Sequence, residues 1–293
     1  MQEFLASKAD NGQRADVVVA TKYPEFTRSS LETLFDKKMV RLGNLPIKPS
    51  KKIAAGDKLI IDESYLRIKP LPIKLPIIYE DNDVIVVNKP AGILTHSKGA
   101  INFEATVASF IASKINDKAM TGNRAGIVHR LDRATSGVII CAKNLKSLTL
   151  LQRQFAKRKT KKTYLAIVEG RVSPPVAIID VPIERNPKNP RSFKVGAKGR
   201  QAQTRYKTIK TFDGPLGSYT YLEVSPITGR THQIRVHLAY LKHPIVGDNV
   251  YGSVGEHLLL HAASLEITLP SKERKRFTAA IPKQFKEFIN AHA

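Results

Sequence analysis

A proline-containing segment divides this chain into two parts. Residues 63–77 read ESYLRIKPLPIKLPI and contain three prolines. Each proline removes a backbone donor and disfavours helix at the residue before it, so we predict an extended linker here. The 293 residues are also enough for roughly two domains. We therefore predict a small domain with its linker over 1–70 and a large domain over 71–293.

The charge balance predicts a polyanionic partner. The chain has 48 Lys and Arg against 25 Asp and Glu, a formal net charge of +23. Charged residues make up 25% of the chain, an ordinary fraction, so the excess comes from a shortage of acids. This balance favours nucleic acid as the partner. A basic chain without a polyanion partner is one alternative; binding to an anionic membrane is another, although no segment resembles a lipid anchor.

Few features suggest secretion, membrane insertion or metal binding. Cys141 is the only cysteine, so the chain forms no internal disulfide and no structural zinc cluster of cysteines. The first residues, MQEFLASKADNG, lack the apolar stretch of a signal peptide, and no apolar run approaches the length of a membrane span. We expect a cytoplasmic protein without a membrane segment.

The large domain shows more strand patterns than helix patterns. Short β-branched runs and alternating segments predict strands, and apolar residues at helical spacing predict helices, with Thr231 as the N-cap of the last. Neighbouring strands are joined by short turns such as DGPLG at 213–217. The fold class is therefore α+β, with a large mixed, mainly antiparallel sheet and flanking helices. The predicted strands are 83–87, 137–142, 162–170, 201–212, 218–227 and 258–269, and the helices are 104–115, 144–159 and 231–241.

The small domain is short and basic. A helix is predicted through LETLFDKK, capped by Ser29 or Ser30, and turns are predicted at Gly43-Asn44 and Gly56-Asp57. The order R-x-D, P-x-x-[ST]-R-S, KPS and GD resembles the α-L RNA-binding domain, although LGN stands at 42–44 where VNG is common. A basic cap without function is the alternative. The cations expected to contact RNA are Arg28, Lys38, Lys48 and Lys51.

Two polar loops in the large domain are candidates for chemistry. In HRLDRATSG at 129–137, Asp132 stands among arginines that favour its ionised form. An Asp–Arg pair that only pins the loop is the alternative. In GRTHQIRVH at 229–237, Arg230 and Arg235 stand near a predicted helix start, where free backbone donors also favour anions. Nucleotide-binding and H-E-x-x-H motifs are absent, and His232 and His237 fall on different helix faces.

Four motifs in order resemble those of the RluA-type pseudouridine synthases. HRLDRATSG agrees with H-R-L-D-x-x-T-S-G at every fixed position, and GRTHQIRVH with HPIVGDNVYG agrees with a second long motif. NKPAG followed by His96 resembles an early motif, although Ser97 replaces a common proline, and KTYLAIVEG resembles a K-x-Y motif. The agreement covers about 78–270, and with the α-L-like region in front the layout resembles the RluC/RluD type.

This resemblance implies a reaction and a set of roles. Such enzymes isomerise uridine within RNA, with no atom gained or lost, so neither cofactor nor metal is expected. Asp132 would act on the ribose as nucleophile or as base, and Arg235 would pair with it. Tyr164 would stack on the uracil and assist loss of the proton from ring carbon 5. Arg130 would fill the gap left by the flipped nucleotide, and His129 would order the loop. Further residues expected at the substrate are Lys89, His96 and Arg230.

The remaining basic runs are expected to hold RNA phosphates. They lie at 152–162, 185–207 and 272–276, and the first includes Lys157, Arg158 and Lys159. For each run, a solvated charged face is the alternative. We expect a monomer acting on large-subunit ribosomal RNA; transfer RNA stays open, as does the target uridine. A non-catalytic RNA-binding or ribosome-assembly factor on the same scaffold is the second hypothesis, and a nucleoside hydrolase is a weaker third.

Overall fold

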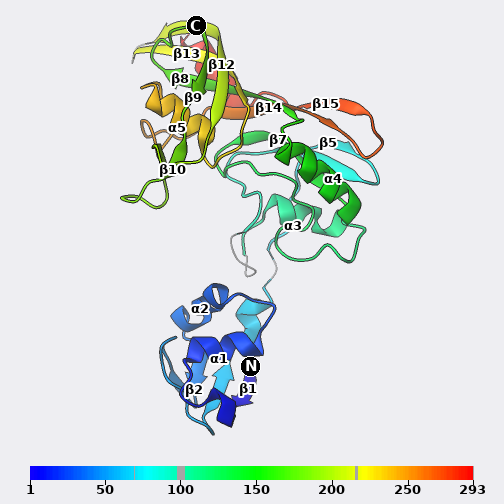
Figure 1. Ribbon diagram of the computed structural model, residues 1–293, viewed down its shortest axis with the longest axis vertical. Coiled ribbons are helices and arrows are strands. Elements are labelled where there is room, and N and C mark those ends of the chain that lie inside the picture. Colours follow the sequence, from blue (N-terminus) through cyan, green and yellow to red (C-terminus); the bar gives the residue numbers. More distant parts are fainter. Residues whose placement is uncertain (69, 98–102, 215–216, 293) are drawn as a thin grey trace. The chain divides into compact units, whose positions relative to one another are not determined.

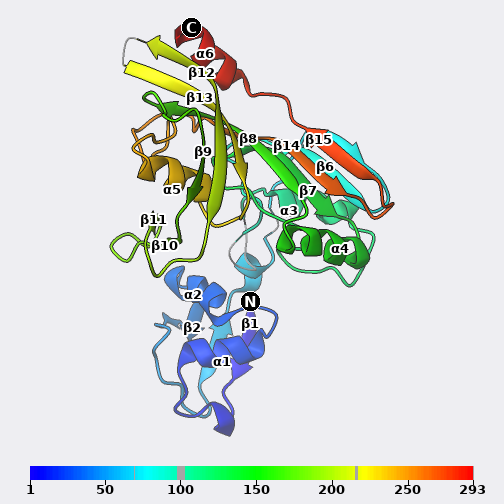
Figure 2. The same cartoon turned by 45° about the horizontal axis from the view of Figure 1, so that its top comes forward.

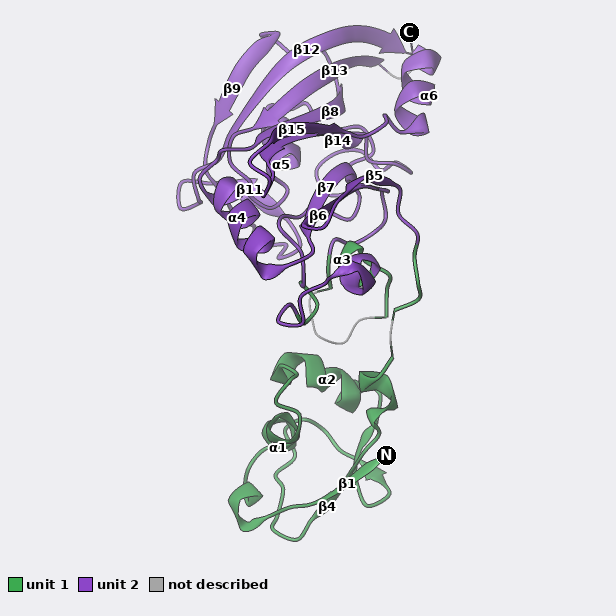
Figure 3. Ribbon diagram, turned by 90° about the vertical axis from the view of Figure 1, so that its right-hand side faces the viewer, with its two compact units in different colours: residues 1–73, 96–109, 121–124 green, residues 74–95, 110–120, 125–293 purple. Residues whose placement is uncertain are grey.

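The computed structural model describes residues 1–68, 70–97, 103–214 and 217–292. It forms two compact units, coloured separately in Figure 3. Residue 69 of the predicted linker and residues 215–216 of the predicted hairpin loop lie outside the described residues. Unit 1 comprises 1–73, 96–109 and 121–124, and unit 2 comprises 74–95, 110–120 and 125–293.

Unit 1 is built on a small antiparallel sheet with strand order β1-β4-β2-β3. Its core contains Leu31 and Leu34 from a helix and Val40 and Ile61 from the sheet, all almost fully buried. The helix is capped by Thr27, whose hydroxyl accepts a hydrogen bond from Ser30 N, so the prediction of Ser29 or Ser30 as the cap is wrong. The elements are β1 (Gln2–Leu5), η1 (Lys8–Asp10), α1 (Ala15–Lys22), α2 (Arg28–Asp36), β2 (Val40–Leu42), β3 (Leu45–Pro46), β4 (Lys58–Ile61) and η2 (Glu63–Leu66).

The start of the predicted linker is helical and not extended. The 3₁₀ helix η2 occupies its first four residues, and Asp62 caps it by accepting a hydrogen bond from Ser64 N. This turn precedes the prolines, so their restriction does not reach it. The next strand, β5 (Ile77–Glu80), begins directly after Pro76.

Unit 2 contains the large sheet expected from the sequence (Figures 1 and 2). Its order in the described residues is β5-β6-β7-β14-β8-β13-β12-β9, with β15 also paired to β14. Every pairing is antiparallel except that of β7 with β14. The mixed, mainly antiparallel α+β fold is therefore confirmed. The further strands are β6 (Val84–Lys89), β7 (Ser136–Ala142), β8 (Lys161–Glu169), β9 (Val176–Asp180), β12 (Gln203–Gly214), β13 (Gly217–Pro226), β14 (Leu260–Thr268) and β15 (Arg274–Thr278).

Helices cover parts of this sheet. Helix α4 packs on β7 and β14, α5 packs on β12 and β13, and α6 packs on β12 (Figures 1 and 2). One hydrophobic cluster joins β8 and β13 to α5 through residues such as Leu222 and Leu238, and another joins β6 and β7 to α4 through Ile140 and Leu151. The remaining elements are α3 (Val107–Ile111), η3 (Ala112–Lys114), α4 (Leu145–Ala156), β10 (Ile183–Arg185), β11 (Phe193–Val195), α5 (Gln233–Tyr240) and α6 (Lys283–His292).

The start of α5 differs from the prediction. Its N-cap is His232, in a left-handed conformation with φ of 54°, and not Thr231. The residues just before the helix form a turn: Gln233 N donates to Arg230 O, and Gln233 Oε1 accepts hydrogen bonds from Arg230 N and from the Thr228 hydroxyl. Arg230 therefore precedes the helix, and only Arg235 lies within its first turn.

Candidate active site

The two predicted polar loops meet in one pocket of unit 2. The pocket has a volume of about 450 Å³, which suits a small ligand or a single base. Its walls come from the loop before β7, the end of α4, strand β8, and the segment that leads from β13 into α5. Residues that are far apart in the sequence, such as Asp132, Tyr164 and Arg235, line it together.

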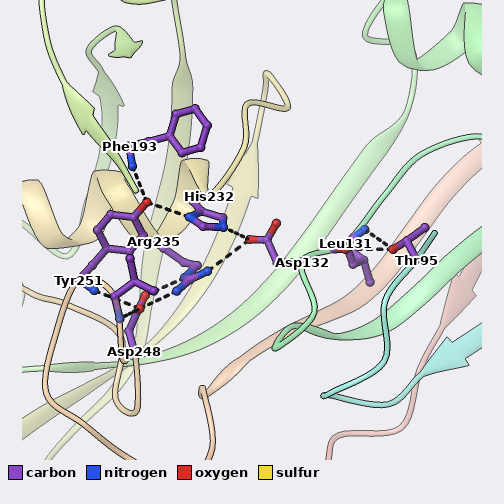
Figure 4. A network of polar contacts seen from close by, with 9 residues as sticks. Thr95, Leu131, Asp132, Phe193, His232, Arg235, Asp248 and Tyr251 are labelled. Carbon is purple, nitrogen blue, oxygen red and sulfur yellow. Dashed lines mark hydrogen bonds and ion pairs between the residues drawn. The ribbon is translucent and has the colours of Figure 1, made fainter. Parts of the chain in front are cut away.

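Hydrogen bonds to Thr95 and within the turn hold the loop that carries Asp132. The Thr95 hydroxyl donates to Leu131 O at 2.9 Å and accepts from Leu131 N at 3.2 Å (Figure 4). Thr135 N donates to Asp132 O, which makes a tight turn before β7. Gly137 then lies so close to Ala262 that a Cβ would fall 2.2 Å from its carbonyl oxygen, and its φ is 119°. A glycine is required where the loop enters the sheet.

Arg235 is bound mainly by Asp248 and contacts Asp132 more loosely. Arg235 Nε and Nη2 donate to the two carboxylate oxygens of Asp248 at 2.8 and 2.7 Å, whereas Arg235 Nη1 lies 3.7 Å from Asp132 Oδ2. The expected ion pair between Arg235 and Asp132 is therefore present, and Asp248, which sequence reasoning did not name as a partner, binds the same guanidinium more closely. Burial opposes the charged form of Arg235, but the hydrogen bonds and charge of Asp248 together raise its pKa. A permanent cation thus faces Asp132 from a fixed position.

His232 also faces Asp132, and sequence reasoning had considered it only as a metal ligand. Its Nε2 lies 3.9 Å from Asp132 Oδ2, and its Nδ1 lies 2.8 Å from the hydroxyl oxygen of Tyr251 (Figure 4). Burial lowers the pKa of His232, although the charge of Asp132 acts in the opposite direction. The position of His232 inside the GRTHQIRVH motif was the feature of the sequence that could have indicated a place in the site.

Two side chains of β8 complete the polar wall. Tyr164 is half-buried, and burial, with the charge of Asp132 added, raises its pKa. Its phenol therefore stays protonated at neutral pH. Lys162 lies two residues away on the same strand, and burial followed by repulsion from Arg158 lowers its pKa to about 8. Lys162 belongs to a predicted RNA-binding run and to the K-x-Y motif, but no role in the pocket was expected for it, and it lines the pocket.

The other residues of the HRLD loop differ in their surroundings. Arg130 lines the pocket and is exposed to solvent. His129 stacks on Phe155 with ring centres 4.5 Å apart, and its Nε2 accepts a hydrogen bond from Ile140 N. Burial lowers the pKa of His129 to about 3, so its ring is neutral. These contacts support the expected loop-ordering role.

The remaining expected substrate residues lie in three different settings. Arg230 lines the pocket and donates from Nε to Gln201 O at 3.0 Å. Lys89 is fully buried, and its ammonium donates to the carbonyls of three loop residues, Pro90, Ile93 and Arg133. It is therefore suited to holding loops rather than to contacting substrate. His96 is half-buried and belongs to unit 1.

The cations expected to bind RNA are on the surface of their units. Lys157, Arg158 and Lys159 follow the end of α4, and Arg158 also lines the pocket. In unit 1, Arg28 is exposed but donates to the buried Asp16 at 2.9 Å, which partly neutralises it. The other three unit 1 cations, Lys38, Lys48 and Lys51, are exposed.

Among the described residues, no three His, Cys, Asp or Glu side chains are grouped as metal ligands would be. The pocket itself offers only one carboxylate, that of Asp132, among its lining residues. None of the described helices is both long and apolar enough to cross a membrane.

Comparison with known proteins identifies the family. Residues 83–240 match the family model described as RNA pseudouridylate synthase. The chain is 39% identical to ribosomal large subunit pseudouridine synthase D of Borreliella burgdorferi over 96% of its own length and 90% of the relative. It is 36% identical to the protein of the same name from Xanthomonas campestris, over 99% of this chain and 92% of the relative.

Two solved structures have a fold similar to that of this chain. The human RNA pseudouridylate synthase domain containing 1 superposes with a TM-score of 0.57 at 24% identity, covering 76% of this chain and 97% of the human chain. For the human domain containing 4 protein the TM-score is 0.58, with 74% and 92% covered. The chain therefore belongs to the RNA pseudouridine synthases, as an RluA/RluD-like member, and is an isomerase that acts on RNA.

Proposed function

We propose that this enzyme converts specific uridines of large-subunit ribosomal RNA to pseudouridine, with Asp132 as the carboxylate that acts on the ribose. The observation that carries the proposal is the setting of Asp132: it lines a pocket of nucleobase size, with Arg235 Nη1 at 3.7 Å. The relatives named for the large ribosomal subunit match nearly the whole chain, which supports ribosomal RNA as the substrate.

The reaction exchanges one bond to the ribose for another. The bond from uracil nitrogen 1 to the ribose breaks, the base turns within the pocket, and carbon 5 bonds to the ribose in its place. A proton then leaves carbon 5 and nitrogen 1 regains one, so the atoms balance. A carboxylate beside the sugar either attacks the ribose or removes a proton from it, as glycosidic chemistry requires. Both roles of Asp132 are compatible with the pocket.

Three neighbours would support this step. The cation of Arg235, with Nη1 3.7 Å from Asp132 Oδ2, would help to orient the carboxylate. The ring of Tyr164 offers an aromatic face to a base that has left its stack, and its hydroxyl keeps its proton. Arg130, exposed where it lines the pocket, would occupy the space that the flipped nucleotide leaves.

Unit 1 and the basic surface would bind the RNA outside the pocket. We assign unit 1 to the α-L type because it has the motif order R-x-D, P-x-x-[ST]-R-S, KPS and GD. The segments that follow its helix α2 carry exposed cations, among them Lys38, Lys48 and Lys51. Lys157, Arg158 and Lys159 would continue this binding beside the pocket through phosphate contacts. We further propose a cytoplasmic monomer that uses neither metal nor cofactor.

Substitution of Asp132 by Asn tests the proposal. The change keeps the size of the side chain and removes its charge, so tritium release from RNA labelled at uridine carbon 5 should fall to the no-enzyme background. Filter binding should show retained RNA affinity, because phosphate contacts dominate it. Asp213→Asn, an exposed carboxylate on the β12–β13 hairpin, is the matched control. Clear release by the Asp132→Asn protein would remove Asp132 from the chemistry.

The same experiment separates the second candidate function. A non-catalytic RNA-binding or assembly factor would bind RNA and release no tritium even as the wild-type chain. Asp132, Tyr164 and Arg235 are all retained in one pocket, which favours the enzyme.

A further inference from the structure

A chain of polar contacts leads from the β10–β11 hairpin to Asp132 (Figure 4). Phe193 N on β11 donates to the hydroxyl oxygen of Tyr251 at 2.9 Å. That oxygen lies 2.8 Å from His232 Nδ1, and His232 Nε2 lies 3.9 Å from Asp132 Oδ2. The Phe193 ring also meets the His232 ring edge-on, with centres 5.8 Å apart. Four residues from separate segments thus contact one another in series.

The contacts of the Tyr251 hydroxyl favour one tautomer of His232. The Tyr251 oxygen already accepts the amide proton of Phe193, and its own proton points to the nearest acceptor, His232 Nδ1. With the Tyr251 proton directed at Nδ1, the single proton of the neutral ring is on Nε2, the nitrogen that faces Asp132. Burial lowers the pKa of His232, the charges of Asp132 and Asp248 oppose this shift, and the guanidinium groups of Arg235 and Arg130 add to it. The net shift is downward, so the neutral form dominates at neutral pH.

The backbone of His232 is held in an unfavourable conformation. Its φ of 54° is costly for a residue with a Cβ. Such strain persists where surrounding contacts hold it, and it is concentrated at functional sites. Here the strained turn directs the ring between Tyr251 and Asp132.

We propose that His232 is a positioning residue for Asp132, and that the Tyr251 hydroxyl and the docked β10–β11 hairpin hold its ring in the tautomer that directs Nε2–H at the carboxylate. Arg235 Nη1 and His232 Nε2 face the same oxygen, Asp132 Oδ2, from 3.7 and 3.9 Å, so a small approach of the carboxylate would give it an uncharged donor beside the cation. The hairpin also carries the exposed cations Lys188, Arg191 and Lys194. Contacts of RNA with this hairpin would therefore bear on the orientation of Asp132. The inference rests on the proposed role of Asp132.

Tyr251→Phe removes the one oxygen that joins the hairpin to His232. The ring remains, including its stacking under Arg235 at 5.1 Å. The single-turnover rate constant of tritium release at saturating enzyme should fall about tenfold, because one orienting hydrogen bond is lost. The Kd for RNA should be unchanged. Tyr240→Phe removes an exposed hydroxyl from the end of α5 and is the matched control, with both constants at the wild-type value.

Two substitutions of His232 separate its two contacts. Asn tolerates the left-handed backbone and can still accept from Tyr251, but it is too short to reach Asp132. His232→Asn should therefore slow the single-turnover step at unchanged Kd. Gln carries an amide N–H near the position of Nε2, so His232→Gln should recover part of the rate. Circular dichroism and melting curves of each variant show whether it is folded.

The outcomes distinguish this inference from the assignment of Asp132. If Asp132→Asn is inactive while folded Tyr251→Phe and His232→Asn proteins react at the wild-type rate, the positioning role is overturned and the catalytic carboxylate stands. Loss of RNA affinity alone in these two variants would also overturn it. If Asp132→Asn retains activity, the proposed function fails first.

Discussion

Arg235 and Asp248 form a buried bidentate ion pair, and the same guanidinium lies 3.7 Å from Asp132 in the pocket. Both oxygens of Asp248 accept from the guanidinium, and Asp248 is fully buried. One of these oxygens also accepts from the backbone N–H groups of Val250 and Tyr251. Asp248 therefore fixes both the cation that faces Asp132 and the turn that presents Tyr251.

We predict that Asp248→Asn weakens both stability and activity. The substitution leaves the charge of Arg235 buried without its anion, which costs about 3–5 kcal/mol for the loss of one partner. Chemical denaturation should show the lower free energy of unfolding, and tritium release should decrease in protein that is still folded. Glu223→Gln, an exposed carboxylate on β13, should change neither. A fully active and stable Asp248→Asn protein would show that Arg235 does not need this anchor.

Salt dependence of RNA binding tests the role of unit 1. Lys48 and Lys51 are exposed, and together Lys48→Gln and Lys51→Gln should weaken binding and flatten the plot of log affinity against log salt by roughly 0.7–0.9 per lost phosphate contact. Lys58→Gln serves as the control because Lys58 is already paired with Glu3 at 2.7 Å. An unchanged slope in the double variant would remove these lysines from the RNA interface.

Chelation should leave the activity intact. The isomerisation needs no external atom or electron, and Asp132 is the one carboxylate among the residues that line the pocket. Protein dialysed against EDTA should therefore release tritium at the untreated rate from RNA whose folding is controlled separately. Activity that is lost and returns only with zinc or magnesium would contradict this prediction.

Stability should decrease as the pH falls below neutrality. Burial lowers the pKa of His129 to about 3 and that of His261 to about 4, from an ordinary value of 6.5. Below pH 6.5 the unfolded chain therefore binds protons that the folded chain does not, so the free energy of unfolding falls as the pH drops toward 4. Denaturant titrations at a series of pH values measure this dependence.

Substitution of His129 tests how much of this pH dependence of stability comes from that residue. His129→Gln keeps an acceptor for Ile140 N and removes the titrating ring, so stability should fall less steeply with acid. His257→Gln, at an exposed histidine, should retain the wild-type dependence. Equal pH dependence in all three proteins would mean that His129 is not a source of the acid sensitivity.

The sequence alone determined the elements whose signals are local. Strand β7 contains the continuous run GVIICA and all its residues are buried. Helix α4 begins at Leu145, directly after Asn144, whose side chain caps it. The motifs around Asp132, Tyr164 and Arg235 indicated the family, which the family model confirms. The three residues that these motifs single out line one pocket. The spacing of apolar residues and the order of motifs can be read along the chain, so they are recognisable without knowledge of the fold.

Only the tertiary structure decided how side chains from distant segments share partners. A helix start was predicted at Thr231, but contacts of Gln233 with Arg230 and Thr228 hold a turn there, and the N-cap is His232. The family resemblance implied an Arg235–Asp132 pair, which is present at 3.7 Å, but the guanidinium is bound more closely by Asp248, thirteen residues away. Which of two acids a cation binds depends on the directions in which loops present them. Those directions are set by the packing of strands and turns, for which the local sequence carries no signal.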